Sequence, residues 1–221
     1  MSDCNFSFEH YRDIIQRYIS AGYHFQSFCD EEKHAKRIYL RHDVDRSLHK
    51  AVKIAEVEAE LGIKATYFLR LHSKFYNCYS YVGLSNIRSI ISAGHELGLH
   101  TEFYDMAKIF DLEPLKVFEL EKKVLEEITR QPIKVFSPHR TSGSSNTAEI
   151  REHIKAIRKQ MSVKCTLDPE FFEELKYVSD SGGEWRSGCP CGSVDKHPVM
   201  QILVHPLWWY KDHIELEDPF L

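Results

Sequence analysis

Short strand-like runs alternate with helical periodicities along this sequence, and that alternation restricts the fold more than any other feature. The runs expected to form strands are 23–25, 37–40, 65–69, 95–100, 134–136, 177–179 and 201–204. The expected helices are 8–21, 48–59, 84–93, 113–130 and 148–160. Such alternation is typical of a mainly parallel sheet with right-handed crossovers. Six or seven strands in a chain of 221 residues predict an α/β fold, a distorted and incomplete (β/α) barrel, with an open doubly wound sheet as the alternative.

The composition is that of an ordinary globular protein. Apolar residues make up 43% of the chain and charged residues 28%, so we expect residues 1–221 to form a single domain around one core. The net charge of -4 provides no basic field for a nucleic acid or an anionic membrane surface. No run approaches the ~18 apolar residues of a membrane-spanning helix, and the first residues lack a signal-peptide pattern. We therefore expect a soluble, cytoplasmic protein with no nucleic-acid partner and no membrane insertion.

The cysteines are scattered along the chain. They are Cys4, Cys29, Cys78, Cys165, Cys189 and Cys191. In a reducing compartment most of them are expected to be free thiols. Cys189 and Cys191 are the only pair close enough in sequence to suggest a metal or redox site, with His197 as a further ligand. Structural zinc sites usually use Cys-x-x-Cys pairs, however, so this signal is weak.

Polar side chains follow one predicted strand after another. They are Asp43 and Asp45, His72, His100 and Glu102, His139 and Arg140, Asp180, and His205. In (β/α) barrels the catalytic groups gather at the carboxyl ends of the strands. We therefore expect these residues to meet on one rim of the barrel.

Two of these strand ends carry residue types that bind metal ions. Asp43 and Asp45 lie on the same side of a strand because side chains alternate, and two like charges that close require a cation or a shared proton. The alternative for Asp45 is an N-cap of the next helix. His100 and Glu102 likewise share a face, and imidazole with carboxylate suits zinc or another divalent first-row ion. His95, at the start of that strand, is expected to be structural.

Two histidines beside prolines are candidates for proton transfer. His139 and His205 each stand at a strand end next to a proline, and a histidine with a pKa near neutrality is a suitable donor to a leaving amine. Trp208 and Trp209 follow His205 and either stack on a sugar ring or pack the end of the barrel. The sequence has no glycine-rich phosphate loop and no Gly-x-Ser-x-Gly turn. Phosphate-binding and serine-hydrolase chemistry therefore have no support.

The order of these motifs resembles the polysaccharide deacetylase family, carbohydrate esterase family 4, over residues 37–209. Residues 41–45 are similar to the first motif of that family, residues 94–100 to the second, and residues 203–206 to the fifth. The resemblance implies a distorted, incomplete (β/α) barrel. It also implies a metal-dependent hydrolase that removes an N-acetyl group from a sugar. The departures described below are similar to those of a divergent branch, the deacetylase-like proteins of bacterial surface-polysaccharide gene clusters.

The resemblance assigns roles to four residues. Asp43 is implied as the catalytic base and His205 as the catalytic acid. Asp45 and His100 are implied as ligands of one divalent metal ion, with zinc as the expected metal. The polarised acetamide would be attacked by water, Asp43 would accept the proton of that water, and His205 would protonate the departing amine.

The chain departs from the family pattern at one metal ligand. The second metal histidine of the family falls four residues after His100, where this chain has Tyr104. We predict that Glu102 supplies the third ligand, because a carboxylate is ionised at neutral pH whereas a phenol with a pKa of ~10 must first lose a proton. His139 is the alternative ligand.

The remaining motif residues are expected to bind the substrate. The third motif survives only as residues 137–140, so its arginine is expected at Arg140, where it would hold Asp43 ionised. Residues 180–185 are similar to the fourth motif, an acidic pocket wall that carries a tryptophan. The expected substrate-binding residues are His139, Arg140, Asp180, Trp185 and Trp208.

The expected substrate is an N-acetylated sugar or glycan precursor of a surface polysaccharide. The missing histidine leaves open a non-catalytic sugar-binding protein of the same fold. Hydrolysis of another non-peptide amide is a further alternative.

Overall fold

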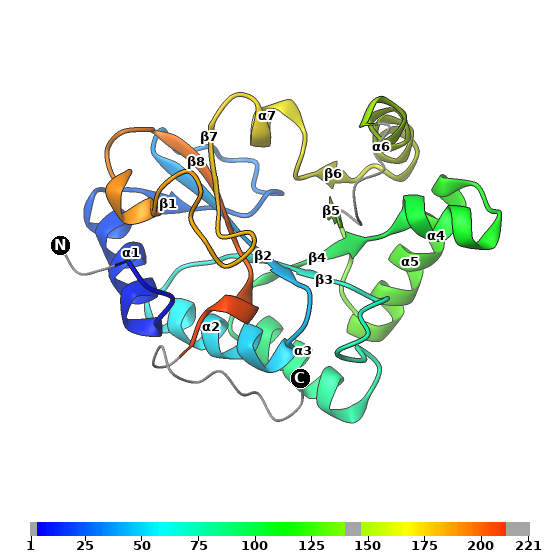
Figure 1. Cartoon of the computed structure of the whole chain (residues 1–221), viewed down its shortest axis with the longest axis horizontal. Coiled ribbons are helices and arrows are strands. Elements are labelled where there is room, and N and C mark those ends of the chain that lie inside the picture. Colours follow the sequence, from blue (N-terminus) through cyan, green and yellow to red (C-terminus); the bar gives the residue numbers. More distant parts are fainter. Residues whose placement is uncertain (1–3, 140–146, 211–221) are drawn as a thin grey trace.

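The centre of the molecule is a curled sheet in which every strand pair is parallel (Figure 1). The computed structural model describes residues 4–139 and 147–210. The strands of these residues are β1 (His24–Phe25), β2 (Arg37–Val44), β3 (Thr66–Leu69), β4 (Glu96–Thr101), β5 (Val135–Pro138), β6 (Lys164–Cys165), β7 (Lys176–Ser179) and β8 (Val199–Val204). Their order is β6-β5-β4-β3-β2-β8-β7, and β1 pairs with the start of β2. The sheet does not close on itself, so the predicted incomplete (β/α) barrel is confirmed.

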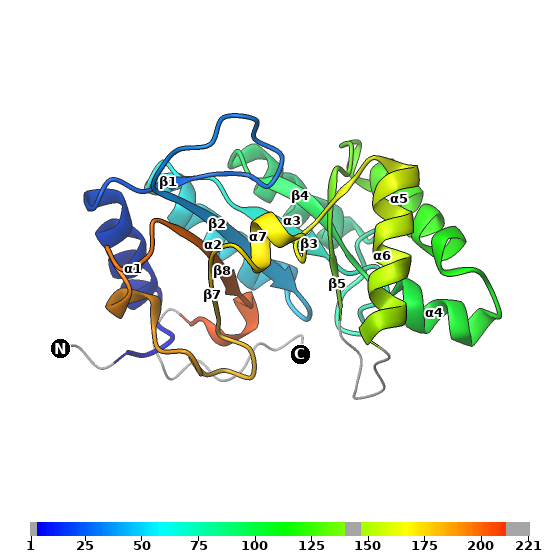
Figure 2. The ribbon, with the colours of Figure 1, turned by 90° about the horizontal axis from the view of Figure 1, so that it is seen from above.

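Most helices cover the outer side of the sheet in chain order, whereas the short last one contributes Phe171 to an apolar cluster on the inner side. They are α1 (Phe8–Ser20), α2 (Leu48–Glu60), α3 (Tyr81–Ser92), α4 (Phe103–Phe110), α5 (Pro114–Thr129), α6 (Thr147–Met161) and α7 (Pro169–Phe172), with short 3-10 turns η1 (Pro190–Gly192) and η2 (Pro206–Trp208). Helix α1 packs against α2, α2 against α3, α3 against α5, and α5 against α6. Figure 2 shows this series from α1 at one end of the sheet to α6 at the other. Within the part of the chain that is described, no helix combines the length and the apolar character needed to cross a membrane.

The two faces of the sheet bury different kinds of residue. Side chains alternate along a strand, so Ile38 and Leu40 of β2 face the helices and belong to the main apolar core. Tyr39 faces inward and packs in a smaller cluster with Phe68 of β3 and Phe171 of α7. Further along β2, the inward side chains are Arg41 and Asp43, and both are buried. The inner face therefore changes from apolar to charged toward the carboxyl ends of the strands.

Serine side chains cap the start of three of these helices, with Ser7 at α1, Ser47 at α2 and Ser80 at α3. The Ser7 hydroxyl accepts the backbone N–H of His10 at the start of α1. Ser80 accepts the N–H of Gly83 in the same way, so α3 begins at Tyr81, three residues before the predicted start. Each hydroxyl satisfies one of the N–H groups that have no partner within the helix.

Three elements were not predicted from the sequence. Strand β6 has two residues and α7 has four, so neither is long enough to show a periodicity. Helix α4 follows β4 after a single residue, Glu102. This early turn removes Glu102 from the strand on which it was expected.

Candidate active site at the carboxyl ends of the strands

Four side chains from four strand ends meet on the inner rim of the sheet. Asp45 follows β2, His100 lies in β4, His139 follows β5 and His205 follows β8. Asp45 Oδ1 lies 3.3 Å from His100 Nε2 and 3.6 Å from His139 Nε2. The other carboxylate oxygen, Oδ2, lies 3.8 Å from His205 Nε2. The rim predicted from the strand ends thus brings one carboxylate and three imidazoles together.

Asp45 is free of the capping role that the sequence left open. The N-cap of α2 is Ser47, whose side chain accepts the N–H of Lys50. Oδ1 of Asp45 is buried and forms no hydrogen bond with the described residues, although two imidazole nitrogens surround it. A buried oxygen without a partner is unfavourable. A cation between these groups would remove that penalty.

His100 is oriented by the backbone. Its Nδ1 lies 3.0 Å from the carbonyl oxygen of Ser137, the neighbouring residue on β5. Because a carbonyl only accepts, Nδ1 carries the hydrogen, and Nε2 faces Asp45 at 3.3 Å. The His139 ring stands at 89° to the His100 ring, with 5.0 Å between the ring centres. Both rings therefore approach Asp45 from different directions.

Glu102 lies behind His139 and not beside the predicted metal position. Arg70, which follows β3, binds both carboxylate oxygens of Glu102, with distances of 2.9 Å from Nε to Oε2 and 2.7 Å from Nη2 to Oε1. Burial opposes ionisation of Glu102, but His139 and Arg70 outweigh it and lower the pKa of Glu102 to about 2. Oε1 also lies 3.4 Å from His139 Nδ1. A carboxylate behind a ligating imidazole fixes the orientation of the ring.

His139, the alternative third ligand of the sequence analysis, lies with Asp45 and His100 where Glu102 was expected. One ligand atom each from Asp45, His100 and His139 lie within 4.8 Å of one another. Two imidazoles and a carboxylate are donors that zinc accepts in catalytic sites. Together with the unpaired oxygen of Asp45, this donor set fits a divalent ion.

Three other residues of the sequence analysis lie outside this cluster. The hydroxyl of Tyr104, on α4, donates to Glu149 of α6 at 2.7 Å. His72 contacts Glu121 of α5 at 2.9 Å. His95 is buried and its Nδ1 accepts the N–H of Ala65 at 3.2 Å. The structural interpretation of His95 agrees with this position.

Asp43 is held by an arginine that the sequence analysis did not identify. Arg41 precedes it by two residues on β2 and therefore faces the same way. Its Nε and Nη2 donate to the two oxygens of Asp43 at 2.8 and 2.7 Å. Burial disfavours the ionised carboxylate, but the Arg41 charge outweighs burial and holds the pKa of Asp43 well below its usual range. Arg140, which was expected to do this, lies outside the described residues.

Every donor of the Arg41 side chain has a partner. Besides Asp43, its Nη1 donates to Thr166 at 3.0 Å and to Gln201 at 3.1 Å. Its Nη2 also donates to the Ser137 hydroxyl. Because all five N–H groups are used, the buried cation is fully satisfied and Asp43 is fixed in one position. Oδ2 of Asp43 lies 3.5 Å from His100 Nε2, beside the cluster.

His205 is paired with a buried carboxylate. Its Nδ1 lies 2.7 Å from Oδ1 of Asp180, which follows β7. Asp180 also accepts the N–H of His205 and the indole N–H of Trp209 at 3.0 Å. Burial disfavours the protonated ring, but the hydrogen bond and charge of Asp180 outweigh it and raise the pKa of His205. Asp180 thus orients His205, and its expected contact with a substrate stays a prediction.

Trp185, Trp208 and Trp209 lie near His205, and we call these three side chains the tryptophan wall. Trp209 is fully buried. The Trp185 ring stacks on Phe6, with 6.2 Å between ring centres and 16° between planes. Trp208 covers Gly183, where a Cβ would lie 3.3 Å from the indole ring. Trp185 and Trp208 are half-buried and belong to the β7–β8 connection and η2.

Comparison with solved structures relates this fold to carbohydrate esterase family 4. The catalytic domain of a peptidoglycan N-acetylglucosamine deacetylase from Eubacterium rectale matches with a TM-score of 0.51 and 16% identity, over 77% of this chain and 76% of that chain. A CE4 family pseudoenzyme from Bacillus anthracis matches with a TM-score of 0.50 and 17% identity, over 77% of this chain. This chain spans 55% of the length of that pseudoenzyme.

A mutant of the pseudoenzyme with restored enzymatic activity matches with the same TM-score of 0.50, 17% identity and 77% coverage of this chain, which spans 57% of the mutant chain. No protein-family model and no curated protein sequence matches the chain. At these identities the comparisons concern the fold. The chain has the fold of the CE4 polysaccharide deacetylases, as its motifs predicted.

Proposed function

We propose that this protein is a metal-dependent amide hydrolase that removes an N-acetyl group from a sugar. The observation that supports it most directly is the cluster of Asp45, His100 and His139, in which a buried oxygen of Asp45 forms no hydrogen bond. An ionised carboxylate, Asp43, lies on one side of the cluster. A histidine with a raised pKa, His205, lies on another.

Asp45, His100 and His139 would hold one divalent ion, with zinc the best match to the donors. When bound, such an ion polarises a carbonyl and lowers the pKa of water toward about 7. Glu102 would orient His139 from behind, through the contact at Nδ1. In this assignment His139 is the third ligand, and Glu102 positions the His139 ring without binding the ion.

Two residues would move protons during hydrolysis. Asp43 is held ionised by Arg41, so it is ready to accept the proton of the attacking water on an Asp43 oxygen. His205 carries a proton at neutral pH more readily than an ordinary histidine, and it would pass that proton from Nε2 to the departing amine. Asp180 holds Nδ1 and leaves Nε2 to face the site.

The proposed substrate is an N-acetylated sugar or a glycan precursor of a surface polysaccharide. One similar structure is the catalytic domain of a peptidoglycan N-acetylglucosamine deacetylase. The Trp185 and Trp208 rings, which are half-buried, offer faces on which a sugar ring would stack. We further propose that residues 1–221 act as one domain.

A non-catalytic protein of the same fold is the competing function, and one similar structure is a CE4 family pseudoenzyme. The Tyr104 substitution motivated this alternative, because the expected second histidine is missing. His139 offers a replacement imidazole from a different strand. This replacement favours the hydrolase.

The deciding experiment measures zinc affinity and deacetylation of N-acetylglucosamine oligomers together. His100→Ala and His139→Ala should each remove zinc binding at this site and activity. Glu102→Gln should weaken zinc affinity or activity by about 10–100-fold, the effect of removing a group that orients a ligand. His153→Ala, a partly exposed histidine on α6, is the matched control and should change neither.

A further variant separates binding from catalysis. Asp43→Asn should keep the zinc and lose about 10²–10⁴-fold in turnover, because the carboxylate that accepts the proton is removed. It should also lower stability, because Arg41 loses its buried ion-pair partner. Full zinc binding and activity in His139→Ala would overturn the ligand assignment. A wild-type protein that binds zinc and sugar but hydrolyses no acetamide or acetyl ester would establish the non-catalytic alternative.

A further inference from the structure

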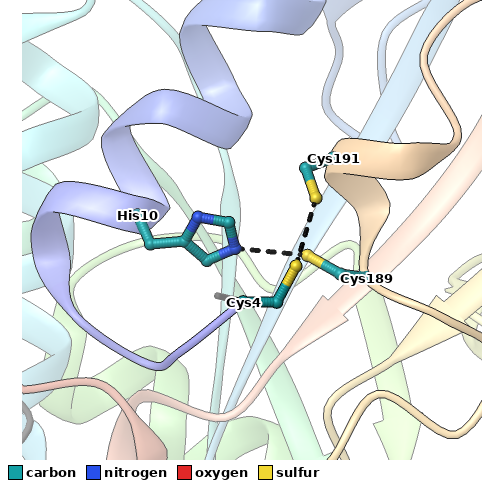
Figure 3. A group of neighbouring side chains, drawn as sticks. All are labelled: Cys4, His10, Cys189 and Cys191. Carbon is teal, nitrogen blue, oxygen red and sulfur yellow. Dashed lines mark hydrogen bonds between the residues drawn. The ribbon is translucent and has the colours of Figure 1, made fainter. Parts of the chain in front are cut away.

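A second group of possible metal ligands, separate from the Asp45–His100–His139 cluster, lies where the two ends of the described chain meet. Cys4 and His10 come from the N-terminal segment and α1, and Cys189 and Cys191 flank the start of η1. Figure 3 shows all four side chains directed toward a common point. One ligand atom from each lies within 4.8 Å of the others.

The distances fit a tetrahedral zinc ion. His10 Nε2 lies 3.3 Å from Cys189 Sγ, and Cys4 Sγ lies 3.5 Å from Cys191 Sγ. Zinc–sulfur bonds of about 2.3 Å and zinc–nitrogen bonds of about 2.0–2.1 Å, at tetrahedral angles, place two sulfurs about 3.8 Å apart and sulfur and nitrogen about 3.5 Å apart. A disulfide needs about 2.05 Å between its sulfurs. The four cysteine and histidine groups are therefore spaced for a shared ion and not for a disulfide, and all three cysteines are free.

The backbone around the cysteine pair is held by α1. The hydroxyl of Tyr18, which is fully buried, donates to the carbonyl of Pro190 at 2.8 Å. The N–H of Gly192 donates to the carbonyl of Cys189 at 3.1 Å. These bonds fix the turn between the two cysteines and direct both thiols toward α1. The ligand positions on this side are thus largely formed before any ion binds.

The N-terminal ligands are anchored as well. Ser7 caps α1 and accepts the N–H of His10, which fixes the start of the helix that carries the imidazole. The N–H of Phe8 donates to the carbonyl of Tyr210, and the N–H of Tyr210 to the carbonyl of Phe6, each at 2.8 Å. The segment that contains Cys4 is therefore attached to the end of the described chain.

The charge near this group also suits a metal–thiolate centre. A dication with three thiolates and a neutral imidazole has a net charge of about -1. The Arg17 guanidinium on α1 interacts electrostatically with both Cys189 and Cys191. Arg17 also binds Asp13 at 2.8 Å, so its charge offsets the residual negative charge only in part.

We propose that Cys4, His10, Cys189 and Cys191 form a structural zinc site. Three thiolates and one imidazole fill all four tetrahedral positions, which is the pattern of a closed, non-catalytic site. His197, which the sequence suggested as a partner of the two cysteines, is not a member of the group. Its carbonyl instead accepts the hydroxyl of Tyr23 at 2.9 Å. The spacing of the cysteine pair was a weak signal because the other two ligands lie near residue 1.

The ion would connect the N-terminal segment to the connection between β7 and β8. That connection also carries Trp185, which stacks on Phe6. Since the ligands are far apart in sequence, metal binding would contribute directly to the folding free energy. The zinc site would then hold the tryptophan wall in place without touching the reacting groups.

Cobalt substitution tests the proposal, because it gives an absorption signal that the cysteine site would produce and the proposed active site would not. Co²⁺ bound to thiolates gives an intense charge-transfer band in the near ultraviolet, whereas a site of imidazoles and a carboxylate gives none. The reduced full-length protein loaded with Co²⁺ should show this band. Cys191→Ser and Cys4→Ser should lose it together with one bound cobalt per chain.

Two controls separate this site from the proposed active site. His100→Ala should keep the thiolate band, and Cys29→Ser, a half-buried cysteine outside the group, should keep both the band and the cobalt stoichiometry. Cys4 is exposed, so its substitution does not threaten the core. Absence of the band in the reduced wild-type protein would overturn the proposal, as would an undiminished band in both cysteine variants. Neither result would bear on deacetylation.

Discussion

At the scale of single residues, the buried arginine beneath the site determines what Asp43 can do. Arg41 binds both oxygens of Asp43, and removing either partner would leave an uncompensated buried charge, a loss of about 3–5 kcal/mol. The pairing keeps Asp43 ionised and uses one lone pair of each oxygen, which leaves a lone pair on each oxygen to accept a proton. Asp45 has no arginine partner, and its Oδ1 faces two imidazoles without forming a hydrogen bond. This difference supports a proton-accepting role for Asp43 and a ligand role for Asp45.

The role of His205 as proton donor can be tested through its partner Asp180. Asp180→Asn removes the negative charge that raises the pKa of His205. A raised pKa keeps His205 protonated above pH 6.5, so the variant should lose the proton at lower pH. In the pH profile of kcat/KM for an amide substrate, the midpoint of the alkaline limb should therefore fall by about one pH unit.

The control for this measurement is Glu184→Gln, an exposed carboxylate in the same connection that pairs with Arg186. It should leave the alkaline limb unchanged. An unshifted limb in Asp180→Asn would mean that a group other than His205 donates the proton.

Sequence spacing predicted some of these neighbours and missed others for a physical reason. The rule that residues two apart share a strand face placed Asp43 beside Asp45, and it applies equally to Arg41, whose role was not recognised. The same rule failed for Glu102 because β4 ends one residue earlier, at Thr101. His139 comes from another strand, so its approach to Asp45 depends on how the sheet curls.

At the scale of elements, the contact of β3 with β4 depends on a residue without a side chain. Gly98 pairs with Phe68 on the neighbouring strand. A Cβ at Gly98 would lie 2.4 Å from Cε1 of the Phe68 ring. That ring belongs to the inner apolar cluster, and it lies 5.6 Å from the Arg41 guanidinium. The absence of a side chain at Gly98 therefore leaves room for the Phe68 ring, which packs beneath the buried Arg41–Asp43 pair.

We accordingly expect Gly98→Ala to destabilise the fold by about 1–3 kcal/mol, the usual penalty for overpacking a core. Urea unfolding measures the change. Gly192→Ala is the control, since nothing lies within 4 Å of a Cβ there, and it should unfold at the wild-type urea concentration. Adding Phe68→Leu to Gly98→Ala should make the two effects non-additive. Strict additivity would show that the ring and the glycine do not interact.

Long elements could be predicted and short ones could not. The pattern of α5 and of β2 extends over enough residues to show a period, so both were expected from the sequence. Strand β6 supplies only Lys164 and Cys165, yet it completes the edge of the sheet next to β5. Its neighbour Thr166 accepts a hydrogen bond from Arg41. The interior of the site therefore depends on an element that carries no detectable periodicity.

At the scale of the whole molecule, the two ends of the described chain close the same wall. Phe6 stacks on Trp185 and meets Trp209 edge-on, with 5.1 Å between the latter ring centres. The Trp209 indole in turn donates to Asp180, which holds His205. The N-terminal segment is thus connected to the proton donor through three contacts. No local sequence pattern predicts this, because the residues are nearly the full chain length apart.

Removing the Phe6 ring should disturb this connection. Phe6→Ala removes two aromatic contacts, each of which is typically worth about 0.5–1.5 kcal/mol beyond simple burial, so stability should fall by roughly 1–3 kcal/mol. All three tryptophans of the chain, Trp185, Trp208 and Trp209, belong to this wall, so intrinsic fluorescence reports on it selectively. The emission should shift toward that of solvent-exposed indole while the far-ultraviolet circular dichroism stays unchanged.

Ile109→Ala provides the comparison, because Ile109 is a large apolar residue that is 70% exposed on α4. It should alter neither emission nor stability. If Phe6→Ala also leaves the tryptophan emission unchanged, the N-terminal segment does not order the wall. The position of His205 would then depend on β7 and β8 alone, since Asp180 follows the first and His205 the second.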